Sequence, residues 1–205
     1  MRAEPGVVYL LDDEPGMVKA LTRLLHTEHY EVHGFSSVAE FLATPRAEGR
    51  SCLVLDVAMP ELDGMELQRR LIARGEAIPV IFLTGHGDIP MSVRAIKDGA
   101  IDFLTKPVDA QALLGAVRSA LAASEGRYLA VREDQVWRNR FASLTPRGKQ
   151  VMALVVTGKL NKQIAAELGT GEQNIKVHRS RVMAKMQVES VAELVRIADR
   201  LRAGT

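Results

Sequence analysis

Five polar side chains follow short apolar runs in the first half of the sequence. Asp12 and Asp13 follow one run, Asp56 a second, Thr84 a third, and Lys106 closes a fourth. If the three carboxylates were gathered within about 5 Å, they would repel by several kcal/mol per pair at an effective dielectric constant near 20, so they would require a cation. Hard oxygen ligands suit Mg²⁺, and a nearby lysine and hydroxyl group would contact the oxygens of a phosphoryl group. The five residues therefore predict a magnesium-dependent phosphoryl site.

Alternating strands and helices are needed to bring these residues together. Strand-length apolar runs occupy residues 7–11, 52–55, 80–83 and 102–104, and the mixed run 30–35 could form an edge strand. Amphipathic segments lie between and after them, at residues 17–25, 37–42, 64–72, 91–96 and 110–121. This order predicts an α/β doubly wound parallel sheet of five βα units, covered on both faces. Ligands of such sheets bind beyond the carboxyl ends of the strands, where the polar residues fall.

A single aspartate at the end of a strand is more often a helix cap or a solvated turn residue than a functional group. The same holds for an isolated threonine or lysine. A pattern in which polar groups of complementary chemistry end successive strands has little structural explanation, so we interpret it as a functional site.

The overall composition is that of an ordinary globular protein. The 205 residues include 47% hydrophobic and 25% charged side chains and one cysteine, so the core does not depend on disulfide bonds. The first residues lack a basic segment followed by an apolar one, and no uncharged apolar run reaches 18 residues. We therefore expect a cytoplasmic protein without a secretion signal or membrane association.

The charge is divided unequally along the chain. Residues 141–205 hold 11 basic and 5 acidic residues, for a net charge of +6, whereas residues 1–140 have a net charge of −4. This asymmetry predicts two domains, with the second close to a polyanion. The acidic first domain could also shield the basic one before activation.

Residues 5–122 resemble the receiver domain of two-component response regulators, and residues 84–107 are especially similar to the FixJ-like branch. The resemblance implies that Asp56 accepts a phosphoryl group from a sensor histidine kinase. It implies that Mg²⁺ is bound by Asp13, Asp56 and the main-chain carbonyl of Ala58, with Asp12 acting mainly through water. Thr84 and Lys106 would contact the acyl phosphate, Phe103 would be the switch aromatic residue, and the Lys106–Pro107 peptide bond would be cis. Phosphorylation would drive homodimerisation.

The second part of the chain predicts helices only. Residues 123–140 are rich in charge and contain no proline, so we expect a helical linker. Thr145–Pro146 signals the start of the next helix, and Asn161 could cap the helix 162–168. Two further helices are expected at about 172–186 and 191–201.

The helix at 172–186 has two unlike faces. Ile175, Val182 and Met186 form an apolar stripe, and the opposite face carries Gln173, Lys176, Val177, Ser180, Arg181 and Ala184. Cations together with an outward-facing valine suit the DNA major groove, where an apolar side chain can meet a thymine methyl group. We include the neighbouring Arg179 among the DNA-binding candidates. An ordinary helical domain with a solvated basic face is the structural alternative.

Residues 143–188 also resemble the LuxR-type (NarL/FixJ) helix-turn-helix domain. The resemblance runs from Leu144–Arg147 through Asn161–Gly169 to Ile175–Ser180. It implies that Lys176, Val177 and Ser180 face bases and that the last helix dimerises. Gly171 stands where a serine cap normally begins the recognition helix, which should cost up to about 1 kcal/mol of stability.

Together these features predict a phosphorylation-dependent transcriptional regulator with a receiver domain at 5–122, a helical linker at 123–140 and a DNA-binding domain at 141–205. Its expected partners are a sensor histidine kinase and double-stranded DNA with two-fold related half-sites. Catalysis would be limited to self-phosphorylation and autodephosphorylation. One alternative is an aspartyl-phosphate phosphatase or phosphotransferase, but the sequence after Asp56 offers no general acid. Another is an RNA-binding antiterminator, which the scarcity of stacking aromatic residues disfavours.

Overall fold

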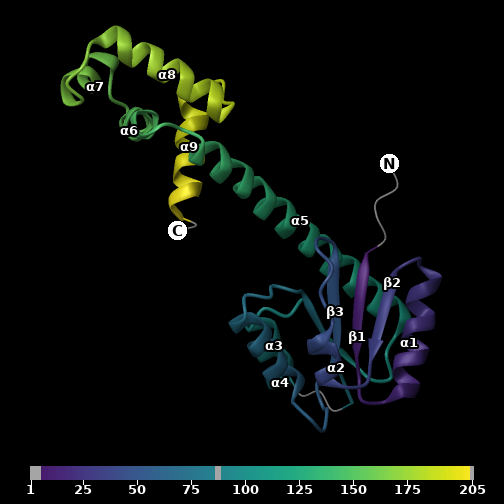
Figure 1. Cartoon of the computed structure of the whole chain (residues 1–205). Coiled ribbons are helices and arrows are strands. Elements are labelled where there is room, and N and C mark those ends of the chain that lie inside the picture. The colour runs from purple at the N-terminus through teal and green to yellow at the C-terminus, as the bar shows by residue number, and fades with distance from the viewer. Residues whose placement is uncertain (1–5, 86–88, 204–205) are drawn as a thin grey trace. The chain divides into compact units, whose positions relative to one another are not determined.

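The computed structural model describes residues 6–85 and 89–203 of the chain (Figure 1). These residues form two compact units, which divide between Leu129 and Ala130. Each unit has its own hydrophobic core.

The first unit contains a five-stranded parallel sheet in the order β2-β1-β3-β4-β5. The strands are β1 (Val7–Leu11), β2 (Glu31–Phe35), β3 (Ser51–Asp56), β4 (Val80–Thr84) and β5 (Asp102–Thr105). All five predicted strands are confirmed, each within one residue at either end, and the mixed run forms the edge strand β2. Because every strand is parallel, the polar residues that end β3 and β4 and those that follow β1 and β5 emerge at one edge of the sheet.

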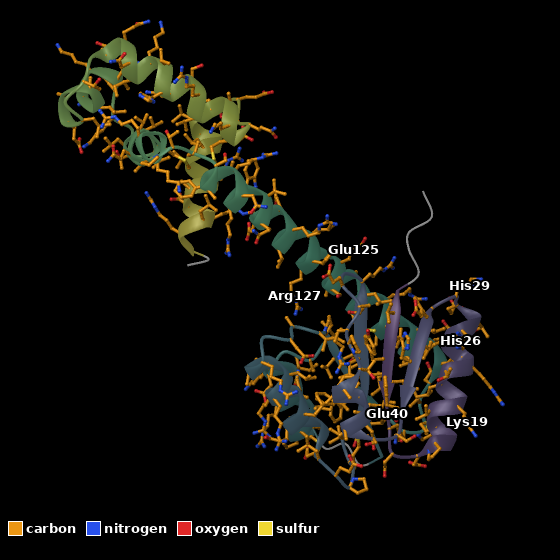
Figure 2. The ribbon with its side chains drawn as sticks, in the orientation of Figure 1. Lys19, His26, His29, Glu40, Glu125 and Arg127 are labelled. Carbon is orange, nitrogen blue, oxygen red and sulfur yellow. The ribbon has the colours of Figure 1, made fainter. Side chains whose placement is uncertain are left out.

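Helices cover both faces of this sheet, and alternate residues of each strand supply the two cores. They are α1 (Pro15–Thr27), α2 (Val38–Ala43), α3 (Gly64–Ala73), α4 (Ile89–Lys97) and the first part of α5 (Ala110–Ala142). Leu53, Leu55 and Phe82 pack with α2, α3 and α4, whereas Val54 and Ile81 pack with α1 and α5. The exposed side chains of Lys19 and His26 lie on the outer side of α1 (Figure 2).

Helix α5 is continuous over 33 residues and includes the predicted helices at 110–121 and 123–140. Its first half is anchored in the core by Leu113, Val117 and Leu121. The helix does not stop at the expected linker because residues 123–140 contain no proline and a single glycine, Gly126.

The second unit is helical. It follows the end of α5 with α6 (Pro146–Val155), α7 (Asn161–Glu167), α8 (Glu172–Met186) and α9 (Val191–Ala203). The Thr145 hydroxyl caps α6 by accepting a hydrogen bond from the Gly148 amide at 3.1 Å. Among residues 6–85 and 89–203, no helix combines the length and apolar character needed to cross a membrane.

The prediction that Asn161 caps the following helix is wrong. Asn161 is the first residue of α7, and the preceding Leu160 holds the cap position. The Leu160 amide donates instead to Oε1 of Gln163 at 2.8 Å. The side chain of Asn161 instead accepts a hydrogen bond from Arg179.

Candidate functional site

Three aspartates form a compact acidic cluster at the carboxyl edge of the sheet. Carboxylate oxygens of Asp12, Asp13 and Asp56 all lie within 4.8 Å of one another. Asp12 and Asp56 are buried, with 0% and 3% of their surface exposed, whereas Asp13 is exposed. The cluster forms because β1 and β3 are hydrogen-bonded neighbours in register, with Leu11 opposite Leu55. The structure thus brings together the three carboxylates that the sequence pattern selected.

Lys106 reaches into this cluster from the residue after β5. Its Nζ atom lies 2.8 Å from Oδ2 of Asp12, 3.2 Å from Oδ1 of Asp56 and 3.5 Å from Oε1 of Glu14. Burial acts to lower the pKa of Lys106, but its hydrogen bonds and attraction to Asp12 and Asp56 outweigh burial and raise that pKa. The lysine therefore stays charged and is shared between the carboxylates of Asp12 and Asp56.

The environment of Asp56 disfavours its ionised form. Burial raises the pKa of Asp56, the charge of Lys106 lowers it, and the charges of Asp12 and Asp13 raise it again, for a net increase. A single ammonium group therefore does not fully compensate the cluster. A second cation at the carboxylates would do so.

The donor set fits a hard divalent cation. Three carboxylates from two adjacent strand ends offer oxygen ligands only, and exposed Asp13 leaves the cluster open to solvent on one side. Mg²⁺ prefers one or two carboxylates and keeps several waters, so a partly open acidic site matches its requirements. The expectation of a magnesium site thus agrees with the residues present.

The other expected site residues occupy the same edge. Thr84 is buried at the end of β4, and its carbonyl accepts a hydrogen bond from the Lys106 amide at 2.7 Å. Phe103 is half-buried on β5, with its ring centroid 6.2 Å from that of Phe82. Ala58 is exposed two residues after Asp56, and the Lys106–Pro107 peptide bond is cis.

Two residues that shape this site were missed by the sequence reasoning. Glu14 is 67% exposed, yet its carboxylate contacts Lys106. Gly64 begins α3 at a point where a Cβ atom would lie only 2.3 Å from the backbone oxygen of Asp56. A glycine directly after the helix-capping Asp63 was the available signal, because any side chain there would displace the Asp56 backbone.

The second unit presents the expected face of α8. Ile175, Val182 and Met186 are buried in its core, as the apolar stripe predicts. Gln173, Lys176, Val177, Ser180 and Arg181 are all exposed, and Val177 is 40% exposed. This face combines an exposed apolar side chain with basic ones, the combination that suits contact with base edges in the major groove.

Arg179 differs from the other candidates on α8. It is half-buried, and its Nη1 atom donates a hydrogen bond of 2.9 Å to Oδ1 of Asn161. This bond joins α8 to the start of α7. Arg179 therefore positions the two helices relative to each other, and only its remaining donors can reach a ligand.

Family patterns match both units. The pattern described as "Response regulator receiver domain" matches residues 8–118, and the pattern described as "Bacterial regulatory proteins, luxR family" matches residues 142–198. The second match favours DNA binding over the RNA-binding alternative.

Individual relatives cover nearly the whole chain. The response regulator protein TodT of Pseudomonas putida is 45% identical over 203 residues, which are 98% of this chain and 89% of that protein. The transcriptional regulatory protein FixJ of Bradyrhizobium diazoefficiens is 40% identical over 199 residues, covering 97% of this chain and 96% of FixJ. The solved structure of the response regulator StyR has a TM-score of 0.84 and 43% identity, and covers 96% of this chain and 99% of StyR. The chain therefore belongs to the response regulators that combine a receiver domain with a luxR-type DNA-binding domain.

Proposed function

We propose that Asp56 accepts a phosphoryl group from a phosphohistidine of a sensor kinase and that this modification controls DNA binding by the second unit. The observation that carries the proposal is the buried Asp56 carboxylate, 3.2 Å from the Lys106 ammonium group and clustered with Asp12 and Asp13. No structural requirement explains three carboxylates gathered around one lysine.

The transfer requires a nucleophile and a way to stabilise negative charge. A carboxylate oxygen of Asp56 attacks phosphorus, the bond from phosphorus to the histidine nitrogen breaks, and the imidazole takes a proton from solvent. Charge spreads over the three equatorial oxygens in the transition state. Lys106 is placed to neutralise one of them, and the buried Thr84 at the end of β4 is proposed to donate a hydrogen bond to another.

Asp12, Asp13, Asp56 and the main-chain carbonyl of Ala58 would hold Mg²⁺, with Asp12 acting mainly through water. When bound, Mg²⁺ would supply positive charge to the phosphoryl oxygens and relieve the repulsion within the cluster. In the protein itself, Lys106 orients Asp12 and Asp56 through direct ion pairs. The proposed cofactor thus adds to a site that the side chains already organise.

The proposed output begins with the charge of the phosphoryl group, about −1.5 to −2 at neutral pH. It would draw Thr84 and Lys106 towards itself and let the half-buried Phe103 move into the vacated space. The changed surface around α4 and β5 would then favour a homodimer. Two DNA-binding units in a dimer would bind two-fold related half-sites.

On DNA, α8 is the proposed reading helix. Lys176, Val177 and Ser180 would face base edges, with Gln173 and Arg181 beside them, and all five are exposed. Arg179 would act mainly through its bond to Asn161, which fixes the position of α8 against α7.

The proposed division of labour follows the predicted boundaries, with the receiver domain at 5–122, the linker at 123–140 and the DNA-binding domain at 141–205. We place the protein in the cytoplasm, where a regulator meets both a kinase and chromosomal DNA. We further propose that it is not an enzyme apart from self-phosphorylation and autodephosphorylation. A rapid turnover of p-nitrophenyl phosphate would instead support the phosphatase alternative.

The decisive experiment is mass spectrometry of the full chain after incubation with acetyl phosphate and Mg²⁺. We expect the mass of one added phosphoryl group in the wild type and in Glu40→Gln, which removes an exposed carboxylate on α2 (Figure 2). Asp56→Asn should remain unmodified. Equal modification of Asp56→Asn, or no modification of the wild type, would overturn the proposal.

A second measurement connects modification to output. DNA-fragment binding and sedimentation should both change when the wild type is phosphorylated, and neither should change for Asp56→Asn. Identical sedimentation of the two wild-type forms at micromolar concentration would exclude dimerisation as the output. Equal DNA affinities for residues 141–205 and the unphosphorylated full chain would exclude shielding by the acidic first unit.

A further inference from the structure

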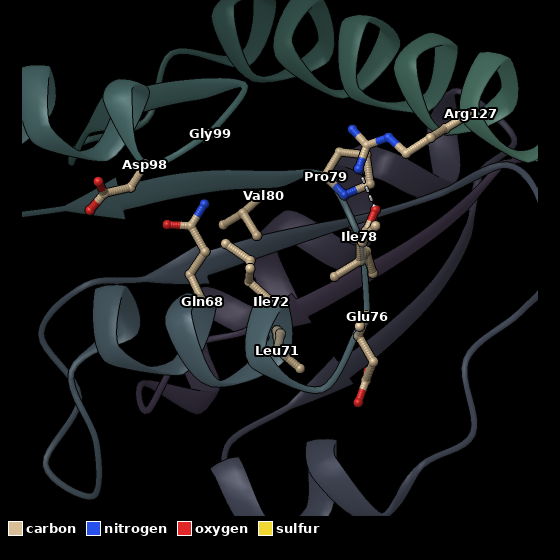
Figure 3. A pocket seen from close by; sticks show the side chains of 12 residues that line it. Gln68, Leu71, Ile72, Glu76, Ile78, Pro79, Val80, Asp98, Gly99 and Arg127 are labelled. Carbon is tan, nitrogen blue, oxygen red and sulfur yellow. Dashed lines mark hydrogen bonds between the residues drawn. The ribbon is translucent and has the colours of Figure 1, made fainter. Parts of the chain in front are cut away.

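A pocket of about 350 Å³ lies at the end of β4 opposite Thr84. Its walls come from the second half of α3, the segment 75–80, the turn after α4, and Arg127 of α5 (Figure 3). Since β4 starts at Val80 in the pocket and ends at Thr84 in the acidic cluster, the two sites are separated by the length of the strand. The volume falls within the range of small-molecule sites, about 300–1,000 Å³.

One buried polar atom in this pocket lacks a partner. Gln68 is 3% exposed, and its Oε1 atom has no hydrogen-bond partner among the residues that the structure describes. Figure 3 shows its amide extending from α3 beside Val80, with Asp98 at one end of the pocket and Arg127 at the other. Buried polar groups are rarely left unsatisfied, so Oε1 calls for a hydrogen-bond donor that enters the pocket.

The surroundings favour a donor that is positively charged. Asp98 lines the pocket, whereas the carboxylate of Glu76, also a lining residue, is paired with Arg46 at 3.7 Å. Helices α3 and α4 end at Ala73 and Lys97, just before the lining residues Gly75 and Asp98, and such helix ends carry negative partial charge. The cationic lining residue, Arg127, is already engaged, because its Nη1 atom donates a 2.7 Å hydrogen bond to the carbonyl of Ala77. That contact shows a guanidinium group held at one end of the same pocket.

The remaining wall is apolar. Leu71 and Val80 are 1% and 2% exposed, and Ile72, Ile78 and Pro79 also line the pocket. A ligand that fits must therefore join a compact hydrophobic body to a group with N–H donors. We infer that this pocket binds a small organic cation, an amidinium or ammonium on an apolar body, whose N–H group donates to Oε1 of Gln68 beside Asp98.

The test is a titration of the full ¹⁵N-labelled chain, followed by the backbone amide signals of residues 68–80 and 98–99. The probes are benzamidinium and its neutral analogue benzamide, which have the same shape. We expect saturable shifts at these residues, with benzamidinium binding about tenfold more tightly, because hydrogen bonds that involve a charged group are the stronger ones. Asp56→Asn should bind it as the wild type does, since the inference does not depend on phosphorylation.

Three variants assign the binding. Gln68→Leu should abolish the shifts, Asp98→Asn should weaken them several-fold, and Glu40→Gln should leave them unchanged. Gln68→Glu keeps the side-chain shape and adds a charge, so it should tighten benzamidinium binding and not benzamide binding. If Gln68→Leu fails to fold, as signal dispersion would reveal, Gln68→Glu decides the question alone.

Equal affinities for the two probes would overturn the inference. So would the absence of saturable shifts, or shifts that persist unchanged in Gln68→Leu. An unchanged or weaker affinity of Gln68→Glu for benzamidinium would also overturn the inference, and would mean that the pocket holds only water.

Discussion

The ammonium nitrogen of Lys106 lies 3.2 Å from Oδ1 of Asp56. The same nitrogen is even closer to Asp12, at 2.8 Å, so the lysine is shared between two buried carboxylates. Burial raises the pKa of Asp56, and the shared Lys106 ammonium group lowers it by less than burial and the neighbouring aspartates raise it. The acidic charge of the site is therefore not fully compensated, and we expect the stability of the protein to depend on both pH and Mg²⁺.

Removing the Asp56 charge should stabilise the metal-free protein. Since the pKa of Asp56 is raised in the folded state, its ionisation costs folding free energy. The protein is therefore more stable while Asp56 is protonated. This extra stability is fully present below the pKa of Asp56 in the unfolded chain, about 3.8, and is lost as pH rises through the pKa of Asp56 in the folded protein. With EDTA at pH 7, we expect the free energy of unfolding of Asp56→Asn to exceed that of the wild type by an amount on the order of 1 kcal/mol. Urea titrations should show this difference closing below pH 4. A constant difference at every pH would contradict the electrostatic origin.

Adding Mg²⁺ should make the wild type more stable than Asp56→Asn, the reverse of their order in EDTA. A ligand that binds only the folded state stabilises it by about 2.7 kcal/mol when its concentration is a hundred times its Kd. The wild type should therefore gain in thermal midpoint as Mg²⁺ is added, whereas Asp56→Asn, which lacks one of the three carboxylates, should gain less. Na⁺ at matched ionic strength is the control. Equal increases in the thermal midpoint of both proteins would show that Asp56 is not a ligand in the proposed metal site.

Gly64 should tolerate no side chain. The Gly64 amide donates to the carbonyl of Val57 at 2.9 Å, and a Cβ atom would overlap the backbone oxygen of Asp56. Relief requires the backbone of Asp56, the proposed phosphoacceptor, to move, so Gly64→Ala should cost about 1–3 kcal/mol and slow phosphorylation by acetyl phosphate. Gly115→Ala, in α5 with nothing within 4 Å of its Cβ, should be neutral or stabilising. A Gly64→Ala protein with wild-type stability and phosphorylation rate would refute the steric argument.

Glu14 should slow the approach of anionic phosphodonors. Its exposed carboxylate lies 3.5 Å from Lys106, at the solvent side of the acidic cluster. An exposed ion pair contributes about 0.2–1 kcal/mol, so Glu14→Gln should raise the rate with acetyl phosphate by up to about fivefold. The gain should shrink as salt rises, because screening weakens exposed charges. Glu40→Gln removes the same charge from another exposed site and should leave the rate unchanged. A rate increase in Glu14→Gln that does not depend on salt would contradict the electrostatic explanation.

The sequence could predict the sheet and the main site because both follow from short-range patterns. Apolar runs of strand length identify β1 to β5, and parallel strands carry Asp12, Asp56, Thr84 and Lys106 to one edge. The α8 face was predictable for the same reason, since a helical period separates buried Ile175 and Val182 from exposed Lys176 and Val177.

Contacts between distant segments could not be predicted in this way. The bond between Arg179 and Asn161 spans 18 positions, so no local pattern reveals it, and the sequence instead favoured Asn161 as a cap. The closeness of Gly64 to Asp56 depends on the path of the loop between them. The unpartnered amide of Gln68 is likewise a property of packing, because a buried glutamine on α3 looks like any other polar helix residue in the sequence.

Measurements of DNA binding by variants of α8 should separate the contribution of side-chain charge from that of side-chain shape. Because Lys176 is proposed to face a base edge, Lys176→Ala should weaken binding most for a site with guanine at the contacted position, by about 1–3 kcal/mol. A uniform loss over all sequences, with a slope of log affinity against log salt lower by about one, would instead indicate a phosphate contact. Val177→Ala should instead change affinity mainly for a site with thymine at the contacted position, by about 1–3 kcal/mol. Arg196→Ala removes an equal charge from the exposed face of α9, and should leave affinity for a single half-site unchanged. Anisotropy titrations of the phosphorylated full chain at several salt concentrations provide all three comparisons. If Arg196→Ala and Lys176→Ala weaken half-site binding equally, the contribution of Lys176 is general charge, and α8 loses its claim to be the reading helix.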